Sequence, residues 1–317
     1  PEQLLRKASD MVSVLKDRAA ETDVLRRIPD ESVQDLLASR LHLIGVPQRF
    51  GGLNVDYGLM LEVGAVLGSG CGSTSWCYSI WAAHSWLVGF WPLEAQKEVF
   101  GNDADTLVSS SLNAGRSTLE KVTGGFRLAG HWEFSSGSDA AGWVMVGALC
   151  PEGLVWALVP RSDYEIVDTW FVSGLRGTGS NDIVVKDVFV PDHRVLVVDQ
   201  AGDEDQTAWE LHRQDRYRVP VRVLLGWDLV APMVGIAQGT IDEFTNLLAG
   251  TSGSGRTAES EGVQLRLSQA SAELDAARAL MRADIRETLK KAGNGDGFST
   301  LERARLRRDK AFVAQLC

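Results

Sequence analysis

The periodicity of the apolar residues changes twice along this chain of 317 residues, and that pattern limits the folds open to it. Residues 1–105 have helical spacing, residues 106–205 have the alternating, β-branched and Gly-punctuated texture of strands, and residues 206–317 are helical again. We therefore predict an α+β protein with a helical domain, a central β-barrel or sandwich domain and a C-terminal helical bundle at those boundaries. Within the β domain we expect a hairpin turn and three clear strands, at Thr123–Phe126 and at Trp143–Leu149, Leu154–Val159 and Ile183–Val190.

The C-terminal domain carries two long apolar stripes in which residues recur at steps of three and four. The first stripe contains Val230, Val234, Ala237, Ile241, Phe244 and Leu248. The second contains Val263, Leu267, Ala270, Leu274, Ala277, Met281 and Ile285. Pro232 either kinks the first helix or marks its first turn. A capping box at Ser299–Glu302 begins a third helix, and because its pattern still continues at Cys317 we expect the bundle to be incomplete.

The N-terminal domain is rich in tryptophan. Asp30 is expected to cap a helix that runs to Leu37, and Ser73–Thr74 begins a later helix. Four tryptophans on and after that later helix recur every five residues: Trp76, Trp81, Trp86 and Trp91. Each step rotates the side chain by about 140°, so they cannot share one face. Most are therefore expected in the core or at a subunit interface, with one or two at most lining a pocket.

Composition excludes several classes of function. The net charge of −10 disfavours binding to nucleic acid or to an anionic membrane, and no run approaches the roughly 20 apolar residues that span a bilayer. The four scattered cysteines fit buried thiols in a reducing cytoplasm. No GxGxxG motif follows a strand, so a Rossmann nucleotide site is not expected, and the five histidines lack metal-ligand spacing, so no metal is expected.

Three segments together resemble the acyl-CoA dehydrogenase superfamily, and they extend over nearly the whole chain. Val46–Gly52 looks like that family's turn between early helices. Gly174–Ser180, running on to Val188–Pro191, looks like its last β-domain segment, and Gln264–Arg278 looks like its long C-terminal helix. The order of helices, β domain and long helices is also that of the superfamily.

Two β-domain segments and one helix point to a subfamily. Ser110–Gly115 stands where the dehydrogenases usually carry Thr-Glu-Pro, and Trp132–Gly137 stands in place of Trp-Ile-Thr-Asn. Both replacements, and Gly72–Trp76 followed by His84, resemble the two-component monooxygenases similar to 4-hydroxyphenylacetate hydroxylase and related steroid-phenol hydroxylases.

The resemblance implies an oxygenase component that receives reduced FMN or FAD from a separate NAD(P)H:flavin reductase. Oxygen would add at flavin C4a to give a hydroperoxide, which would hydroxylate an aromatic or polycyclic small molecule, although nitrogen or sulfur could also be the acceptor atom. It also implies a homotetramer, with the stripe Val263–Ile285 as candidate surface. The alternatives are an acyl-CoA dehydrogenase that oxidises an acyl thioester with FAD, and a catalytically inactive relative with a structural or binding role.

The resemblance assigns three catalytic residues. Ser136 matches the family serine near flavin N5, with Ser135 as the alternative, although Ser-Ser-Gly is also ordinary turn chemistry. His84 would orient a substrate hydroxyl and favour its phenolate, although a buried histidine is often only a core residue. Ser110 matches the residue that helps His84 hold the substrate; Ser111 is nearly as plausible, and both could simply be strand serines bonded locally.

Further contacts follow from the same resemblance. The flavin contacts would be Ser111, Leu112, Trp132, Ser135, Ser136 and Arg256, and the substrate contacts would be Trp81, His84 and Ser110. Arg256 matches an arginine that reaches the flavin across a subunit interface, and its alternative is a solvated loop arginine. The missing C-terminal helices would supply further flavin contacts that this chain does not contain.

Overall fold

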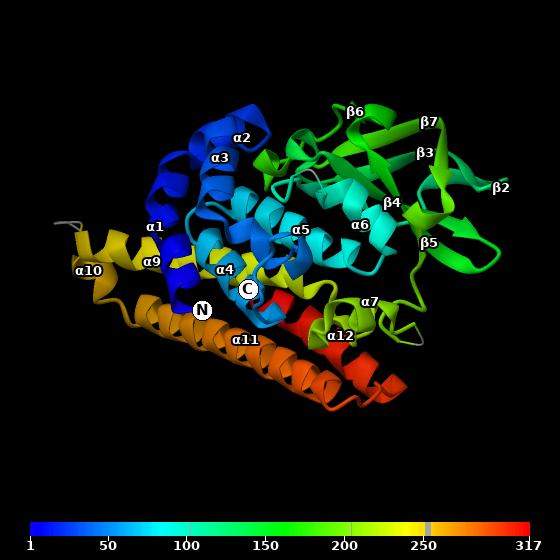
Figure 1. Cartoon of the computed structure of the whole chain (residues 1–317). Coiled ribbons are helices and arrows are strands. Elements are labelled where there is room, and N and C mark those ends of the chain that lie inside the picture. The colour runs from blue at the N-terminus through cyan, green and yellow to red at the C-terminus, as the bar shows by residue number, and fades with distance from the viewer. Residues whose placement is uncertain (102, 204, 251–254) are drawn as a thin grey trace.

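The computed structural model describes residues 1–101, 103–203, 205–250 and 255–317. The order of its elements confirms the predicted α+β class (Figure 1). The first helices are α1 (Glu2–Asp17), α2 (Ala19–Leu25), α3 (Asp30–Ser39), α4 (Tyr57–Gly68), α5 (Gly72–Val88) and α6 (Leu93–Phe100). The strands are β1 (Val108–Ser111), β2 (Arg116–Val122), β3 (Gly125–Ser135), β4 (Trp143–Cys150), β5 (Gly153–Pro160), β6 (Glu165–Val167), β7 (Asn181–Pro191) and β8 (Val195–Val197). The last helices are α7 (Thr207–His212), α8 (Val221–Leu224), α9 (Trp227–Gly250), α10 (Gly255–Ala258), α11 (Glu261–Gly293) and α12 (Thr300–Leu316).

The strands form two four-stranded sheets, in the orders β1-β4-β5-β8 and β2-β3-β7-β6. The predicted hairpin turn is confirmed between β2 and β3, where Gly124 takes the left-handed conformation that glycine allows (φ +79°). The three predicted strands are confirmed as β4, β5 and β7. Inward-facing side chains of both sheets share one apolar core, which contains Leu128, Trp132, Val144, Val146, Ala157, Val159, Ile183 and Val185.

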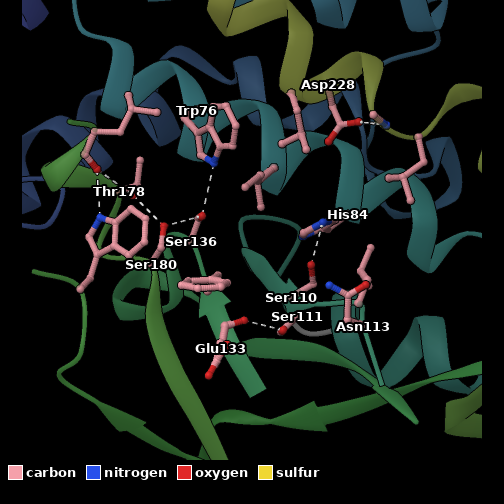
Figure 2. Close-up of a pocket in the computed structure, with 18 of the residues that line it drawn as sticks. Trp76, His84, Ser110, Ser111, Asn113, Glu133, Ser136, Thr178, Ser180 and Asp228 are labelled. Carbon is pink, nitrogen blue, oxygen red and sulfur yellow. Dashed lines mark hydrogen bonds between the residues drawn. The ribbon is translucent and has the colours of Figure 1, made fainter. Parts of the chain in front are cut away.

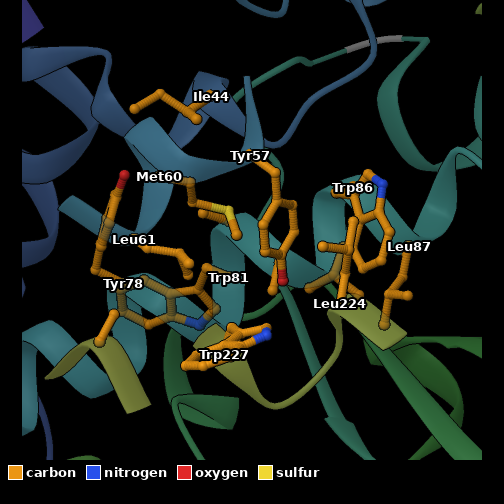
Figure 3. Close-up of a cluster of buried hydrophobic side chains, with 14 of the residues drawn as sticks. Ile44, Tyr57, Met60, Leu61, Tyr78, Trp81, Trp86, Leu87, Leu224 and Trp227 are labelled. Atoms are coloured by element: carbon orange, nitrogen blue, oxygen red, sulfur yellow. The ribbon is translucent and has the colours of Figure 1, made fainter. Parts of the chain in front are cut away.

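The helical core is built on α4, α5 and α9 (Figure 3). These helices approach closely because they meet at small residues: a Cβ at Gly235 of α9 would lie 2.8 Å from the Cα of Gly68 in α4. Pro232 lies inside α9, in its second turn. Among the described residues, one helical stretch, Val221–Ala249, is long and apolar enough by composition to cross a membrane, but 56% of its most apolar window is buried inside the protein.

The second stripe does not form one continuous outer surface. Leu274, Ala277, Met281 and Ile285 are buried within the chain, where α11 packs on α9, α4 and α12, and only the part of the stripe before Leu274 remains accessible. The prediction that the whole of Val263–Ile285 faces another subunit is therefore wrong for its C-terminal half. An apolar stripe on a helix indicates that another surface covers it, but the sequence does not show whether that surface belongs to the same chain or to a partner subunit.

The predicted caps at the N-termini of two helices are partly confirmed. The capping box at Ser299 is confirmed, with its hydroxyl accepting from the Glu302 N–H and the Glu302 carboxylate accepting from the Ser299 N–H. Asp30 is not a cap, because α3 begins at Asp30 and Pro29 precedes it as the N-cap residue. Two cysteines are buried as expected, but Cys150 is only partly buried and Cys317 is exposed.

Candidate active site

A cavity of about 640 Å³ lies where α5, the two sheets and the first turn of α9 meet (Figure 2). Its volume is within the range of small-molecule sites. The polar and aromatic side chains that line it are Trp76, His84, Ser110, Ser111, Asn113, Glu133, Phe134, Ser136, Trp170, Thr178, Ser180 and Asp228. Segments that are distant in the sequence therefore contribute to one chemical site.

His84 lies in the middle of α5, and its side chain is buried. Burial lowers its pKa to about 4, against the opposing effect of its hydrogen bond to Val108, so the ring is neutral at pH 7. The Val108 carbonyl, 3.1 Å from Nδ1, can only accept, so Nδ1 carries the proton. Nε2 is therefore an acceptor, and the Ser110 hydroxyl donates to it at 3.1 Å. His84 and Ser110 thus form a neutral pair that can accept a further hydrogen bond through the Ser110 oxygen.

Consecutive serines of β1 have different partners. Ser110 faces the cavity, whereas the Ser109 hydroxyl donates to the Ser136 carbonyl at 2.8 Å and accepts from the Ser135 hydroxyl at 2.8 Å. The Ser111 hydroxyl donates to the Glu133 carbonyl at 2.7 Å, at the cavity wall. These bonds tie β1 to the end of β3 and hold the Ser136 backbone in place.

The hydroxyl of Ser136 belongs to a chain of hydrogen bonds whose direction can be derived from one end. Thr178 donates to the Leu175 carbonyl at 2.9 Å, so its oxygen must accept from Ser180 at 2.7 Å. Ser180 has then used its proton and must accept from Ser136 at 2.7 Å. The Trp76 indole N–H also donates to Ser136, at 3.3 Å. Ser136 is left with one free lone pair in the cavity wall, and it can accept a hydrogen bond there but cannot donate one.

A β-bulge decides which serine faces the cavity. The register between β3 and β7 shifts between Trp132 and Ser135, and Phe134 takes a left-handed conformation (φ +65°) that is rare for a non-glycine residue. Ser135 is consequently buried behind the wall and Ser136 lines it. Trp132 also points away from the cavity, into the core between the sheets, where its indole N–H donates to the Gly147 carbonyl at 2.7 Å. The side chains of Trp132 and Ser135 therefore do not line this cavity, and their contact with the flavin stays a prediction.

Of the four regularly spaced tryptophans, Trp76 lines the cavity and Trp81 does not. The Trp81 indole N–H donates to the Gly137 carbonyl at 3.2 Å, and a Cβ at Gly137 (φ +68°) would lie 2.7 Å from the indole nitrogen. Trp81 therefore supports the turn after Ser136 from behind, and its contact with substrate stays a prediction that the lining of this cavity does not support. Ser111 and Leu112, two of the predicted flavin contacts, line the cavity, whereas the side chain of Arg256 lies outside the described residues.

Several cavity residues were not predicted, and among them are Trp170, Thr178, Ser180 and Asp228. Thr178 and Ser180 lie in the segment that carries the resemblance to the superfamily. Two hydroxyls that are two residues apart were the sequence signal that could have identified them as site residues. Trp170 belongs to a segment held by Arg26, which bonds both carboxylate oxygens of Asp168 and the Trp170 carbonyl. Among the described residues, no group of three His, Cys, Asp or Glu side chains could hold a metal ion.

The wall of this cavity has the chemistry that a reduced flavin needs. The flavin ring system is flat and largely apolar, and its N5–H requires an acceptor. Trp76, Phe134 and Trp170 supply aromatic surface, and the Ser136 lone pair supplies an acceptor that no described residue uses. The residues present therefore fit the group.

Comparison with known proteins gives consistent results. Residues 228–317 match the family model of the acyl-CoA dehydrogenase C-terminal domain. The chain is 34% identical to the oxygenase subunit of a flavin-dependent monooxygenase from Rhodococcus jostii, covering 96% of this chain and 82% of that protein. It is 31% identical to the oxygenase component of an FADH2-dependent resorcinol hydroxylase from Rhizobium sp., covering 89% and 72%. The crystal structure of 3-HSA hydroxylase from Rhodococcus sp. RHA1 superimposes with a TM-score of 0.92 at 32% identity, covering 99% of this chain and 83% of that one.

These relatives support the monooxygenase prediction over the acyl-CoA dehydrogenase alternative. The cofactors that go with it are reduced flavin and molecular oxygen. By its fold, its C-terminal domain and its similarity to these enzymes, the chain belongs to the oxygenase components of the flavin-dependent monooxygenases, built on the acyl-CoA dehydrogenase fold.

Proposed function

We propose that this protein hydroxylates an aromatic small molecule that carries a phenolic hydroxyl, using reduced FMN or FAD from a separate NAD(P)H:flavin reductase. The observation that carries the proposal is the neutral His84–Ser110 pair, whose outer oxygen accepts from the cavity. The bound flavin supplies the oxygen chemistry: it activates O2 and transfers one oxygen atom to the ring. Names of the relatives as an oxygenase subunit and an oxygenase component add support for a partner reductase.

The pair would orient the substrate through two linked hydrogen bonds. The phenolic O–H donates to the Ser110 oxygen, while Ser110 continues to donate to Nε2 of His84. The ring nitrogen is held in place by the bond from Nδ1 to Val108. Because burial keeps the pKa of His84 at about 4, its main contribution is to position the substrate hydroxyl. The ring would accept a proton only from a substrate whose hydroxyl becomes strongly acidic during the reaction.

Ser136 would act on the flavin side. Its free lone pair would accept from the N5–H of a bound reduced flavin and hold that proton in place, which would oppose loss of hydrogen peroxide. The apolar side chains of Ile80, Leu112 and Leu229 line the same cavity and exclude water from the reacting atoms.

The test of this function is hydroxylation of simple phenols with chemically reduced flavin. Wild-type protein is expected to give a catechol-type product, and His84→Ala is expected to lose most product while its affinity for reduced flavin, measured anaerobically, stays unchanged. Wild-type protein should give no product with NADH and oxidised flavin when no reductase is added. Product in that mixture would contradict a two-component system, and loss of flavin affinity in His84→Ala would contradict the substrate role.

We also propose a homotetramer acting in the cytoplasm, with domains at 1–105, 106–205 and 206–317. Support for assembly comes from α11, where Leu265 is 62% exposed and Val263 and Leu267 are only partly covered. Light scattering at micromolar concentration is expected to give four times the monomer mass, and a monomer would contradict the proposal.

A further inference from the structure

Asp228 is a cavity residue that the proposed mechanism does not use. It is the second residue of α9, it is 2% exposed, and it lines the same cavity as His84. Its Oδ1 accepts from the Gly226 N–H at 2.7 Å. Its Oδ2 accepts no hydrogen bond from the described residues. This oxygen is not one of the fully buried atoms that lack a partner, so it remains accessible. One carboxylate oxygen is therefore left to face the ligand space (Figure 2).

The charge of Asp228 is supported from behind but not bonded on the cavity side. Burial raises its pKa to about 6, and the Gly226 N–H, its own N–H and Lys310 oppose this, so the group is ionised at neutral pH. Lys310 does not bond to it, because its ammonium donates to the carbonyls of Arg222, Val223 and Leu225. An anionic oxygen in a nearly dry site is unfavourable until a donor reaches it. A ligand in the cavity can supply this donor.

The position of Asp228 specifies where that donor must be. Asp228 enters from α9, whereas Ser110 enters from β1, and in the view of Figure 2 they lie on opposite sides of His84. The cavity therefore has an acceptor for a phenolic hydroxyl, which β1 supplies, and a separate anionic acceptor, which α9 supplies. A ligand that satisfies both must carry two separate hydrogen-bond donors.

We propose that Asp228 determines substrate specificity by accepting a hydrogen bond from a second hydroxyl or amino group of the aromatic substrate. The substrate class is then an aromatic compound with a phenolic hydroxyl and a second donor. This inference rests on the proposed function, because it takes the His84–Ser110 pair as the phenol site. The alternative role of Asp228 is confined to the fold, since an acidic residue in the first turn of a helix is favourable by itself.

Matched ligand pairs distinguish the two roles. In each pair a hydroxyl is replaced by a methoxy group, which accepts but cannot donate: resorcinol and 3-methoxyphenol, hydroquinone and 4-methoxyphenol, and 4,4′-dihydroxybiphenyl and its monomethyl ether. Affinities are measured by calorimetry on the full chain loaded with reduced flavin without oxygen, so that no turnover occurs. Wild type is expected to prefer the hydroxyl member of at least one pair by about tenfold or more, because hydrogen bonds to a charged acceptor are stronger than neutral ones.

The test variant is Asp228→Asn, which can keep an oxygen toward the Gly226 N–H and place an N–H in the cavity. It is expected to reduce the preference for the hydroxyl member about tenfold, because the amide can donate to a methoxy oxygen. In the control His84→Asn, both members of a pair should weaken equally, so their ratio should not change. Equal binding of both members of every pair by wild type would overturn the proposal whether or not the variant folds, as would an unchanged ratio in folded Asp228→Asn. Failure of the proposed function itself is distinguishable, because then no simple phenol would be bound or hydroxylated.

Discussion

Replacing Ser136 by alanine is expected to divert oxygen from product to hydrogen peroxide. The direction of the hydroxyl chain leaves Ser136 one lone pair in the cavity, and a flavin N5–H is the donor that it suits. A neutral hydrogen bond contributes about 0.5–1.5 kcal/mol net, which corresponds to roughly a two- to thirteenfold change in rate. The rate of peroxide release after reduced enzyme–flavin complex is mixed with oxygen, without substrate, should rise by that factor. A peroxidase-coupled assay measures it directly.

Ser135→Ala is the matched control for this experiment. Ser135 is fully buried one residue away, and its hydroxyl donates to Ser109 at 2.8 Å instead of facing the cavity. Both variants leave buried partners unsatisfied, so each should lower the free energy of unfolding by about 1–3 kcal/mol. Only Ser136→Ala should change peroxide release. Equal effects of the two variants, or no effect of either, would refute the argument from the direction of the hydrogen bonds.

Three further outcomes are expected. The unfolded chain binds more protons than the folded one between the folded pKa of His84, about 4, and its ordinary value of 6.5, so wild type should lose stability as the pH falls through that range. His84→Asn lacks the ionisable ring, so over that pH range its free energy of unfolding, measured by urea denaturation, should fall by up to about 3 kcal/mol less than that of wild type. Equal losses in the two proteins would contradict a buried neutral ring. Trp132→Phe should lower the unfolding free energy by about 1–2 kcal/mol by leaving the Gly147 carbonyl unpaired, while reduced-flavin affinity stays the same; weaker flavin binding would mean that Trp132 touches the ligand. Ser299→Ala should cost about 1 kcal/mol through loss of the capping box, and an unchanged melting temperature would show that the cap contributes nothing.

The fold was predictable from the sequence because its signals are local and repeated. Strands β4 and β5 are short continuous apolar runs, β7 is rich in β-branched residues, and the stripe of α9 keeps helical spacing over several turns. The partner of an apolar face is not a local property, which is why the stripe of α11 was assigned to another subunit although half of it packs within the chain.

The site was predictable as a set of segments but not as a set of side-chain directions. Resemblance placed His84, Ser110 and Ser136 in one region, and the structure brings all three to one cavity. The resemblance could not decide between Ser135 and Ser136, because that choice depends on the bulge at Phe134. A left-handed conformation usually requires glycine, and since Phe134 is not a glycine the sequence gives no signal for the bulge. Trp132 lies before this bulge, and its side chain fills the core between the two sheets, a direction that the resemblance alone does not show.

The acceptors in this cavity share one chemical property that none of them shows alone. The Ser110 hydroxyl donates its hydrogen bond to His84, the Ser136 hydroxyl donates its hydrogen bond to Ser180, and the Asp228 carboxylate has no proton to donate at neutral pH. Each of these groups reaches this state through a partner outside the ligand space: the Val108 carbonyl, the Leu175 carbonyl through Thr178 and Ser180, and the Gly226 N–H together with the charge of Lys310. The cavity is therefore arranged to accept donors at three places. A reduced flavin with its N5–H and a substrate with two donors would satisfy all three, whereas an oxidised flavin, which has no N5–H, would leave the Ser136 lone pair unused.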